Sequence, residues 1–287
     1  MADLTAIVLT KNEEANIRAC IESVRDFAKR VVVVDSGSTD KTCELAASLG
    51  ADVYTNPFTY YAAQFNWGLG NTGIDTEWVL RLDADERFTQ PLCRECESLL
   101  AAADEKGWNG IAMEADFYFL GRLMKHGLAN KRKIMLFRRG HGQIEDRKRD
   151  AHTILYDGGY ATAKHRFLHY DFKDLNSYIA RYNWYTIREL QDYLAYESGV
   201  SQEVNTDRRL QRHRKNKFNI YYRAPMFLRS FLWFCYNYYF KLGFLDGREG
   251  YIYHWFECYW YRFLVDAKIY EQRITGHAPE ELKAFGQ

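Results

Sequence analysis

Two short apolar runs, each followed at once by a polar side chain, constrain the fold of this chain more than any other feature. The first run spans residues 5–10 and the second spans residues 31–34. Both are apolar throughout and rich in β-branched residues, which is typical of parallel strands covered on both faces. A buried helix turn is the alternative. We predict strands here, and further strands at 53–54 and 78–83.

Signals that start helices stand between these runs. Thr10 and Glu13 have the Thr-x-x-Glu spacing of a capping box, in which each side chain bonds a backbone amide near the other. We therefore expect a helix from there to about Val24. Asp40 is placed to cap a second helix that runs to Leu49. Strands that alternate with helices predict an α/β fold with a mainly parallel central sheet.

Acidic residues stand where two predicted strands end, at Asp35 and at the run Asp83, Asp85 and Glu86. Ligands of such sheets bind beyond the carboxyl ends of the strands. Two carboxylates separated by one residue suit Mg²⁺ or Mn²⁺, and such an ion neutralises a departing diphosphate. The same spacing occurs in surface loops, and Asp35 could merely close an Asx turn before Gly37. Position at a strand end favours the metal site.

Three segments resemble the signatures of glycosyltransferase family 2, namely TAIVLTKNEE from Thr5, VVVDSGSTDKT from Val32 and WVLRLDADE from Trp78. Segments that begin at Phe119, Met135, Leu168 and Lys241 are similar to the branch containing lipopolysaccharide-core β-glucosyltransferases. The resemblance therefore covers nearly the whole chain. It implies a GT-A fold, a nucleoside-diphosphate sugar donor, a divalent metal, and inversion at the anomeric carbon by single displacement.

The resemblance also implies roles for individual residues. Thr10 and Asp35 match positions that hold the nucleotide base, and Glu13 lies beside that pocket unless it serves only the capping box. Asp83 matches the carboxylate near the ribose, and Asp85 matches the metal ligand. We expect these five residues to form the donor site.

An inverting displacement needs a base that takes the proton of the acceptor hydroxyl. Relatives show Asp-Arg followed shortly by Val-His-Glu, whereas here Asp146-Arg147 is followed by Thr153 in place of the Glu. Asp146 is the first candidate for the base, and Asp150 and Glu145 are the alternatives. Each could instead be a solvated partner of the surrounding Lys and Arg residues.

Other residues have two interpretations each. His169 lies where GT-A enzymes commonly place a metal or diphosphate contact, although a structural histidine would fit as well. Arg81 could meet the donor or pair with Glu77. Cys93 and Cys96 have the spacing of half a zinc site or a redox motif, but no second pair stands nearby, so we expect two free thiols.

The C-terminal part is helical in pattern, aromatic and locally basic. We predict a helix over 174–194 and two aromatic helices over 226–240 and 251–270, joined by a turn region at 243–250. With the basic run at 208–217, these amphipathic helices could lie on an anionic membrane surface, where each cation contributes about 1 kcal/mol. They could equally pack together or form a subunit interface, which would make the chain a homo-oligomer.

These patterns predict a GT-A catalytic domain over 1–170 and a helical region over 171–287. Within the domain, the nucleotide-binding half spans about 1–100 and the acceptor-side half about 101–170. Six scattered cysteines favour a reducing compartment. The start lacks a basic leader with a long apolar core, and no run approaches the ~20 apolar residues of a membrane span. We expect a cytoplasmic protein, peripheral on the inner face of the cell membrane.

The expected function is transfer of a hexose from a nucleotide sugar, UDP-sugar first, to a lipid-linked, lipopolysaccharide or polysaccharide acceptor. A net charge of +1 gives no reason to expect nucleic acid as a partner. An aspartyl-nucleophile phosphatase would use Asp83 and Asp85, but Arg87 replaces the usual Thr or Val and two strands precede the motif. A non-catalytic membrane adaptor that binds nucleotide sugars would explain why Thr153 stands where relatives have a Glu.

Overall fold

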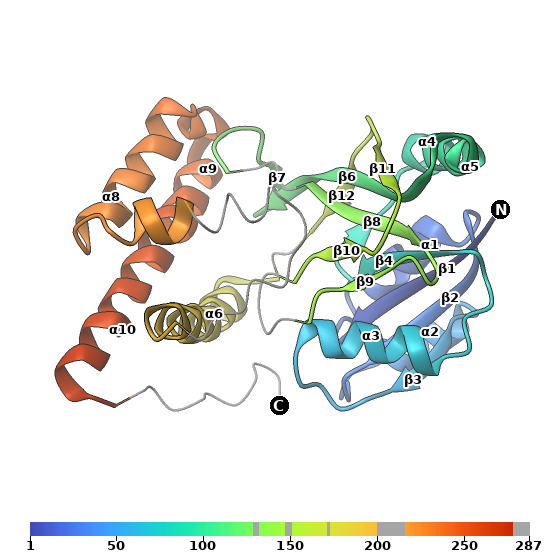
Figure 1. Cartoon of the computed structure of the whole chain (residues 1–287), viewed down its shortest axis with the longest axis horizontal. Helices are drawn as coiled ribbons and strands as arrows, with labels where there is room; N and C mark the ends of the chain where they lie inside the picture. Colours follow the sequence, from blue (N-terminus) through green and yellow to red (C-terminus); the bar gives the residue numbers. More distant parts are fainter. Residues whose placement is uncertain (129–131, 147–150, 171–172, 200–215, 278–287) are drawn as a thin grey trace. The chain divides into compact units, whose positions relative to one another are not determined.

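The computed structural model describes residues 1–128, 132–146, 151–170, 173–199 and 216–277 (Figure 1). The chain divides into two compact units. The first consists of Met1–Phe117 and Asn130–Asp171, and the second of Tyr118–Ala129 and Phe172–Gln287. We describe each unit by itself.

Four parallel strands begin the first unit. They pair in the order β3-β2-β1-β4, with bounds β1 Ala2–Thr10, β2 Ala28–Asp35, β3 Asp52–Thr55 and β4 Trp78–Asp83. Each of the strands predicted from an apolar run is present. Because neighbouring strands run in the same direction, their carboxyl ends meet at one edge of the sheet.

Helices cover both faces of this sheet because side chains alternate along β1. Leu4, Ala6 and Val8 pack in a core with α1, α2 and α4, whereas Ile7 packs in a second core with α3. The helices are α1 Ile17–Val24, α2 Thr42–Ser48, α3 Tyr61–Asn71, α4 Gln90–Ala101 and α5 Ala103–Lys106. Burial on both faces explains why these strands are apolar throughout.

The sheet continues past β4 with strands in both directions, in the order β4-β8-β6-β12-β5. Their bounds are β5 Glu86–Arg87, β6 Trp108–Phe119, β8 Arg132–Arg138, β11 Gly159–Thr162 and β12 Phe167–His169. β11 also pairs with β6, while β9 Gly142–Ile144 and β10 Thr153–Leu155 form a separate hairpin. The expected α/β fold with parallel strands at its centre is confirmed.

The second unit is helical apart from the end of β6 and its partner β7 Arg122–Leu123. Its helices are α6 Leu175–Glu197, η1 Lys217–Tyr221, α8 Leu228–Cys235, η2 Tyr236–Phe240, η3 Gly243–Asp246, α9 Gly247–His254, η4 Trp255–Trp260 and α10 Tyr261–Thr275. Aromatic rings fill its core. Tyr178 stacks on Tyr182 with centroids 4.1 Å apart and meets the edge of Phe119 at 5.6 Å.

The aromatic helices are confirmed, but the connection between them is shorter than predicted. α8 continues into η2 up to Phe240, and α9, η4 and α10 follow one another from Gly247 to Thr275. The predicted turn region therefore contains the 3-10 turn η3 and the beginning of α9. Within the described residues, no helix is both long and apolar enough to cross a membrane.

The predicted capping box is wrong. Thr10 is the last residue of β1, and its hydroxyl donates a hydrogen bond to Asp35 at 2.9 Å. Helix α1 begins only at Ile17, and the carboxylate of Glu13 accepts a bond from the Asn16 side chain at 2.9 Å. A contact across the sheet edge thus outcompetes the local cap. The second predicted helix is present, but its N-cap is Lys41, and Asp40 one residue earlier accepts from the amide of Thr42, the first residue of α2.

Candidate active site

The predicted acidic residues gather at the carboxyl edge of the parallel strands. Thr10 stands opposite Asp35 in the pairing of β1 with β2, and Leu9 stands opposite Asp83 in the pairing of β1 with β4. Asp85 follows in the tight turn that joins β4 to β5. The fold therefore brings both acidic segments to the edge where ligands of α/β sheets bind.

The carboxylate of Asp83 is held by a tyrosine that sequence reasoning missed. The hydroxyl of Tyr61 donates to Asp83 Oδ1 at 2.7 Å and accepts from Arg81 Nε at 2.8 Å. The amide of Asp83 donates to Glu86 Oε2 at 3.0 Å. Burial, reinforced by the negative charge of Glu86, raises the pKa of Asp83 to about 6. This strand end is therefore rich in negative charge.

Lys133 of β8 balances part of that charge. Its Nζ donates to Glu86 Oε1 at 2.8 Å, and Glu86 is fully buried. Burial alone would lower the pKa of Lys133, but attraction to Glu86 and Asp83 outweighs it and raises that pKa. The cations Lys133 and Arg81 thus lie among the carboxylates of Asp83 and Glu86.

His169 lies beside Asp85, the other side chain for which we expect a metal contact. β12 runs antiparallel to β5, so His169 stands opposite Glu86 and the Tyr170 amide donates to the Asp85 carbonyl at 2.9 Å. The distance from His169 Nε2 to Asp85 Oδ2 is 3.6 Å, and the two side chains are 19% and 18% exposed. The ring of Phe117 meets the imidazole edge-on at 5.4 Å. The Asp85 carboxylate and the His169 imidazole are therefore both partly accessible, and their neighbours hold them in place.

These two side chains fit a divalent ion as a partial set of ligands. A carboxylate oxygen and an imidazole nitrogen suit Mn²⁺, and the oxygen suits Mg²⁺. Among the described residues, no group of three His, Cys, Asp or Glu side chains is arranged to hold a metal. In the described part of the chain an ion at Asp85 and His169 would have two protein ligands, and phosphate oxygens of a substrate are of the right chemical type to add to them.

Asp35 orders the loop after β2. Its carboxylate accepts from the amides of Gly37 at 2.8 Å and Ser38 at 2.7 Å, and from the hydroxyls of Ser38 and Thr10 at 2.5 and 2.9 Å. Burial opposes ionisation, but these donors outweigh it and lower the pKa of Asp35. Four bonds use the capacity of a carboxylate. Asp35 would therefore have to exchange a donor in order to contact a nucleotide base.

Glu13 belongs to a loop that is tied to the loop after β2. Its amide donates to Thr42 Oγ1 at 2.7 Å, while the amide of Thr39 donates to Asn12 Oδ1 at 2.8 Å. Asn12 has φ +53°, a left-handed conformation that Asn tolerates better than most residues. The two loops beyond β1 and β2 thus form one cross-linked rim.

Asp146 reaches the same region from the hairpin β9–β10. Asn66 of α3 clamps Ile144 by bonds to its carbonyl and its amide at 2.8 and 3.1 Å. Two residues on, exposed Asp146 accepts from the hydroxyl of Tyr60 at 2.6 Å. Tyr60 immediately precedes Tyr61, the partner of Asp83. Consecutive tyrosines therefore bond to both candidate carboxylates.

The other candidates for the base differ from Asp146. Glu145 is fully buried, and Asp150 lies outside the described residues. Thr153, which stands where relatives have Glu, donates its hydroxyl to the carbonyl of Ile134 at 2.7 Å. Only Asp146 combines exposure with a described place beside the tyrosines.

Two further predictions have clear outcomes. Arg81 bonds to Tyr61 instead of pairing with Glu77, whose carboxylate lies 3.2 Å from Arg138. Cys93 and Cys96 are buried free thiols on α4, as expected. The contacts of Tyr61 and Lys133 had no sequence signal, because neither residue lies in a recognisable motif.

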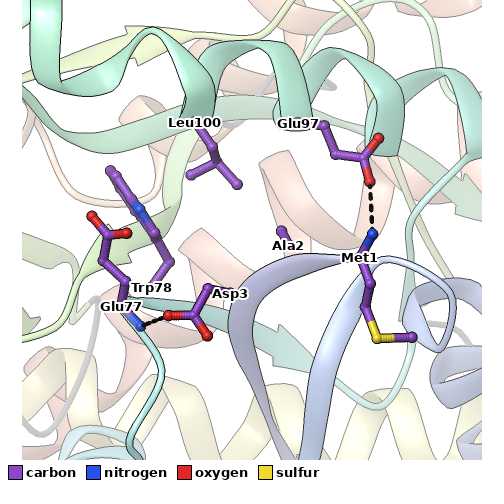
Figure 2. Close-up of a pocket in the computed structure, with 7 residues that line it drawn as sticks. All are labelled: Met1, Ala2, Asp3, Glu77, Trp78, Glu97 and Leu100. Carbon is purple, nitrogen blue, oxygen red and sulfur yellow. Dashed lines mark hydrogen bonds and ion pairs between the residues drawn. The ribbon is translucent and has the colours of Figure 1, made fainter.

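A hollow at the opposite end of the sheet holds none of the predicted site residues (Figure 2). It lies at the amino ends of β1 and β4, where the Glu77 amide donates to Asp3 at 3.0 Å and the amino group of Met1 lies 3.7 Å from Glu97. Ligands of parallel sheets bind at the carboxyl ends. The carboxylate cluster is therefore the better candidate site.

The chain is similar to known and uncharacterized glycosyltransferases. The chain is 28% identical to the lipopolysaccharide core biosynthesis glycosyltransferase LpsC of Rhizobium meliloti over 284 residues, 96% of this chain and 95% of that protein. It is 40% identical to an uncharacterized glycosyltransferase of Rickettsia bellii over 102 residues, 36% of this chain and 34% of that protein. The match thus spans nearly the full length of LpsC, but only about a third of the length of the Rickettsia bellii protein.

Among solved structures, glucosyl-3-phosphoglycerate synthase from Mycobacterium tuberculosis, in complex with Mn²⁺, UDP and glucosyl-3-phosphoglycerate, is 23% identical. The match covers 40% of this chain and 44% of that chain with a TM-score of 0.33. The sequence model of Glycosyl transferase family 2 matches residues 5–169. Because this match covers more than half of the chain, including Asp35, Asp83, Asp85 and His169, the protein belongs to glycosyl transferase family 2.

Proposed function

We propose that this enzyme moves a hexose from a nucleoside-diphosphate sugar, UDP-sugar first, to a glycan of the lipopolysaccharide core or another lipid-linked or polysaccharide acceptor. The observation that carries the proposal is the meeting of Asp85 and His169 at the strand ends, where Oδ2 and Nε2 lie 3.6 Å apart. Similarity to LpsC along nearly the whole chain supports the choice of acceptor.

On the donor side, Asp85 and His169 would hold Mg²⁺ or Mn²⁺. When bound, the ion would offset the negative charge that develops on the departing diphosphate. Tyr61 fixes one oxygen of Asp83, which leaves the other for the ribose. The cross-linked loops of Thr10, Glu13 and Asp35 would form the wall of the base pocket. Rigid loops limit the entropy lost when the donor binds.

On the acceptor side, Asp146 would act as the base. The acceptor oxygen forms a bond to the anomeric carbon while the bond from that carbon to the diphosphate oxygen breaks. The proton of the hydroxyl passes to the carboxylate of Asp146, and the electron pair leaves with the diphosphate. One displacement of this kind inverts the anomeric configuration. The bond from Tyr60 holds one oxygen of Asp146, so the carboxylate is oriented before the acceptor arrives.

Binding and hydrolysis of donors test this proposal. UDP-, GDP- and dTDP-sugars are screened with and without Mn²⁺ by thermal shift, because a ligand that binds the native state raises its apparent stability. We expect one class of nucleotide to stabilise the protein only with metal, and the same sugar to be released slowly to water. Stabilisation without transfer to any acceptor would indicate a non-catalytic adaptor. A phosphoenzyme on Asp83 would indicate a phosphatase.

A further inference from the structure

Large apolar side chains line an exposed side of α8 and η2 in the second unit. They recur at helical spacing, and each is about half exposed or more, with Phe240 reaching 80%. We name them the first aromatic row: Leu228, Phe231, Leu232, Tyr236, Tyr239 and Phe240. A helix with such a row normally buries it against something.

A second aromatic row follows α9, η4 and α10 at intervals of four residues. It consists of Tyr251, Trp255, Tyr259 and Phe263, and consecutive ring centroids lie 6.4, 4.7 and 5.7 Å apart. Tyr251, Trp255 and Phe263 are 47%, 40% and 37% exposed. The core residues of the same helices, such as Tyr261 and Val265, are buried. One side of the row packs against rings of α8 and η2, such as Phe234 and Tyr238, and the other side is exposed.

The two rows meet and form one surface, which we name the aromatic face. The ring of Phe231 contacts Tyr259 with centroids 6.4 Å apart, and Phe227, which precedes the first row, contacts Phe263 at 5.1 Å. Contiguous apolar surface of this kind is uncommon on soluble proteins and marks a site of interaction.

The charged residues on and next to the aromatic face indicate what kind of partner it binds. From Leu228 to Leu242 the sequence has two charged residues, Arg229 and Lys241, and no Asp or Glu. Arg229 is buried against Asp266. Lys241 is exposed, and its Nζ lies 5.2 Å above the ring of Tyr236. The sequence that precedes these helices, residues 208–217, adds six Lys and Arg residues and no acid.

We propose that the aromatic face docks on a membrane surface that contains anionic lipid. Tyr and Trp suit the depth of the headgroups, where one end of the side chain is apolar and the other polar. Lys241 would meet the lipid phosphates. A symmetric contact between two copies is disfavoured, because it would bring the same positive edge together without a carboxylate in the first row. The proposal uses no residue of the candidate active site and does not rest on the proposed reaction.

Flotation of the full chain with vesicles tests the proposal. Vesicles of phosphatidylcholine alone are compared with vesicles that also contain phosphatidylglycerol. We expect the protein to float with the anionic vesicles, and the double variant Leu232→Gln/Phe240→Gln to bind them at least about tenfold more weakly. Both side chains are mostly exposed, so the helices should still fold. Lys241→Gln should weaken binding about fivefold.

A matched control removes two exposed aromatic residues from the first unit. Tyr156 and Tyr160 are 58% and 43% exposed, and Tyr156→Gln/Tyr160→Gln should float like the natural protein. Asp85→Asn should also float normally, which separates this proposal from the proposed reaction. The proposal is overturned if the natural protein floats with neither kind of vesicle. It is also overturned if the Leu232→Gln/Phe240→Gln variant binds the anionic vesicles as strongly as the natural protein does. A dimer in ultracentrifugation that this variant dissociates would likewise overturn it.

Discussion

Both units of the chain bury charged side chains, but they balance them differently. In the second unit, Arg229 bonds to Asp266 through Nε and Nη2 at 2.9 and 2.5 Å, with both side chains almost inaccessible. In the first unit, Arg81 and Lys133 lie among the carboxylates of Asp83 and Glu86, and burial, reinforced by Glu86, raises the pKa of Asp83 to about 6. Arg229 and Asp266 form one direct ion pair, whereas the cluster of the first unit borders the partly exposed side chains of Asp85 and His169.

This difference separates structural from functional charge. A buried charge with a full set of partners holds helices together without attracting a ligand. A carboxylate with a shifted pKa beside accessible side chains that can bind metal is typical of a functional site, and Asp83 beside Asp85 and His169 fits this pattern. Changes in the first unit should therefore affect activity, and changes at Arg229 should affect stability.

The largest effect is expected for Asp146→Asn. Loss of a general base typically lowers the rate by about 10²- to 10⁴-fold, so transfer should fall by that factor while UDP binding and the unfolding midpoint stay unchanged. Initial rates with a saturating donor measure the loss. The matched control is Asp157→Asn, which removes another exposed carboxylate of the same unit, one bonded to His141. Full activity of Asp146→Asn would move the role to Glu145 or Asp150.

Arg229→Met should instead lower the free energy of unfolding, by about 3–5 kcal/mol, because it leaves Asp266 buried without its partner. Urea denaturation measures this change. Arg229→Met/Asp266→Leu should recover most of it, since no unpaired charge remains. Lys29→Met, which breaks an exposed pair with Asp3, should cost less than about 1 kcal/mol. If Arg229→Met lowered the free energy of unfolding as little as Lys29→Met does, the buried pair would not hold the second unit together.

Tyr61→Phe should give the smallest effect of the three changes, and it tests whether the Tyr61 hydroxyl orients the Asp83 carboxylate. It removes the bond to the carboxylate and the acceptor for Arg81, worth about 1–1.5 kcal/mol, so kcat/KM should fall about tenfold. Steady-state kinetics with a varied donor measure this. Tyr54→Phe removes a hydroxyl that accepts from Arg30 far from the carboxylates and should leave kcat/KM unchanged. An unaffected Tyr61→Phe would mean that Asp83 needs no hydroxyl to orient it.

The sequence allowed the sheet and the place of Asp35, Asp83 and Asp85 to be predicted. Strands buried on both faces leave long β-branched runs, and their carboxyl ends must meet at one edge when they run in parallel. Asp83 and Asp85 could therefore be placed from local pattern alone, without knowledge of the remaining chain.

The neighbours of these residues could not be predicted in the same way. Lys133 reaches Glu86 because β8 pairs with β4 in antiparallel register, with Leu80 opposite Leu136. A pairing between distant segments leaves no periodic trace in either of them. Thr10 shows the opposite case. Its spacing to Glu13 predicts a capping box, but its hydroxyl bonds to Asp35 across the sheet edge instead.

Binding of UDP in the presence and absence of Mn²⁺ tests the central claim, that Asp85 anchors the metal and diphosphate of the donor. Isothermal titration of the natural protein, Asp85→Asn and the control Asp157→Asn gives the three affinities directly. We predict that Mn²⁺ tightens UDP binding about tenfold or more in the natural protein and the control, and leaves it unchanged in Asp85→Asn. Equal tightening in Asp85→Asn would contradict the account.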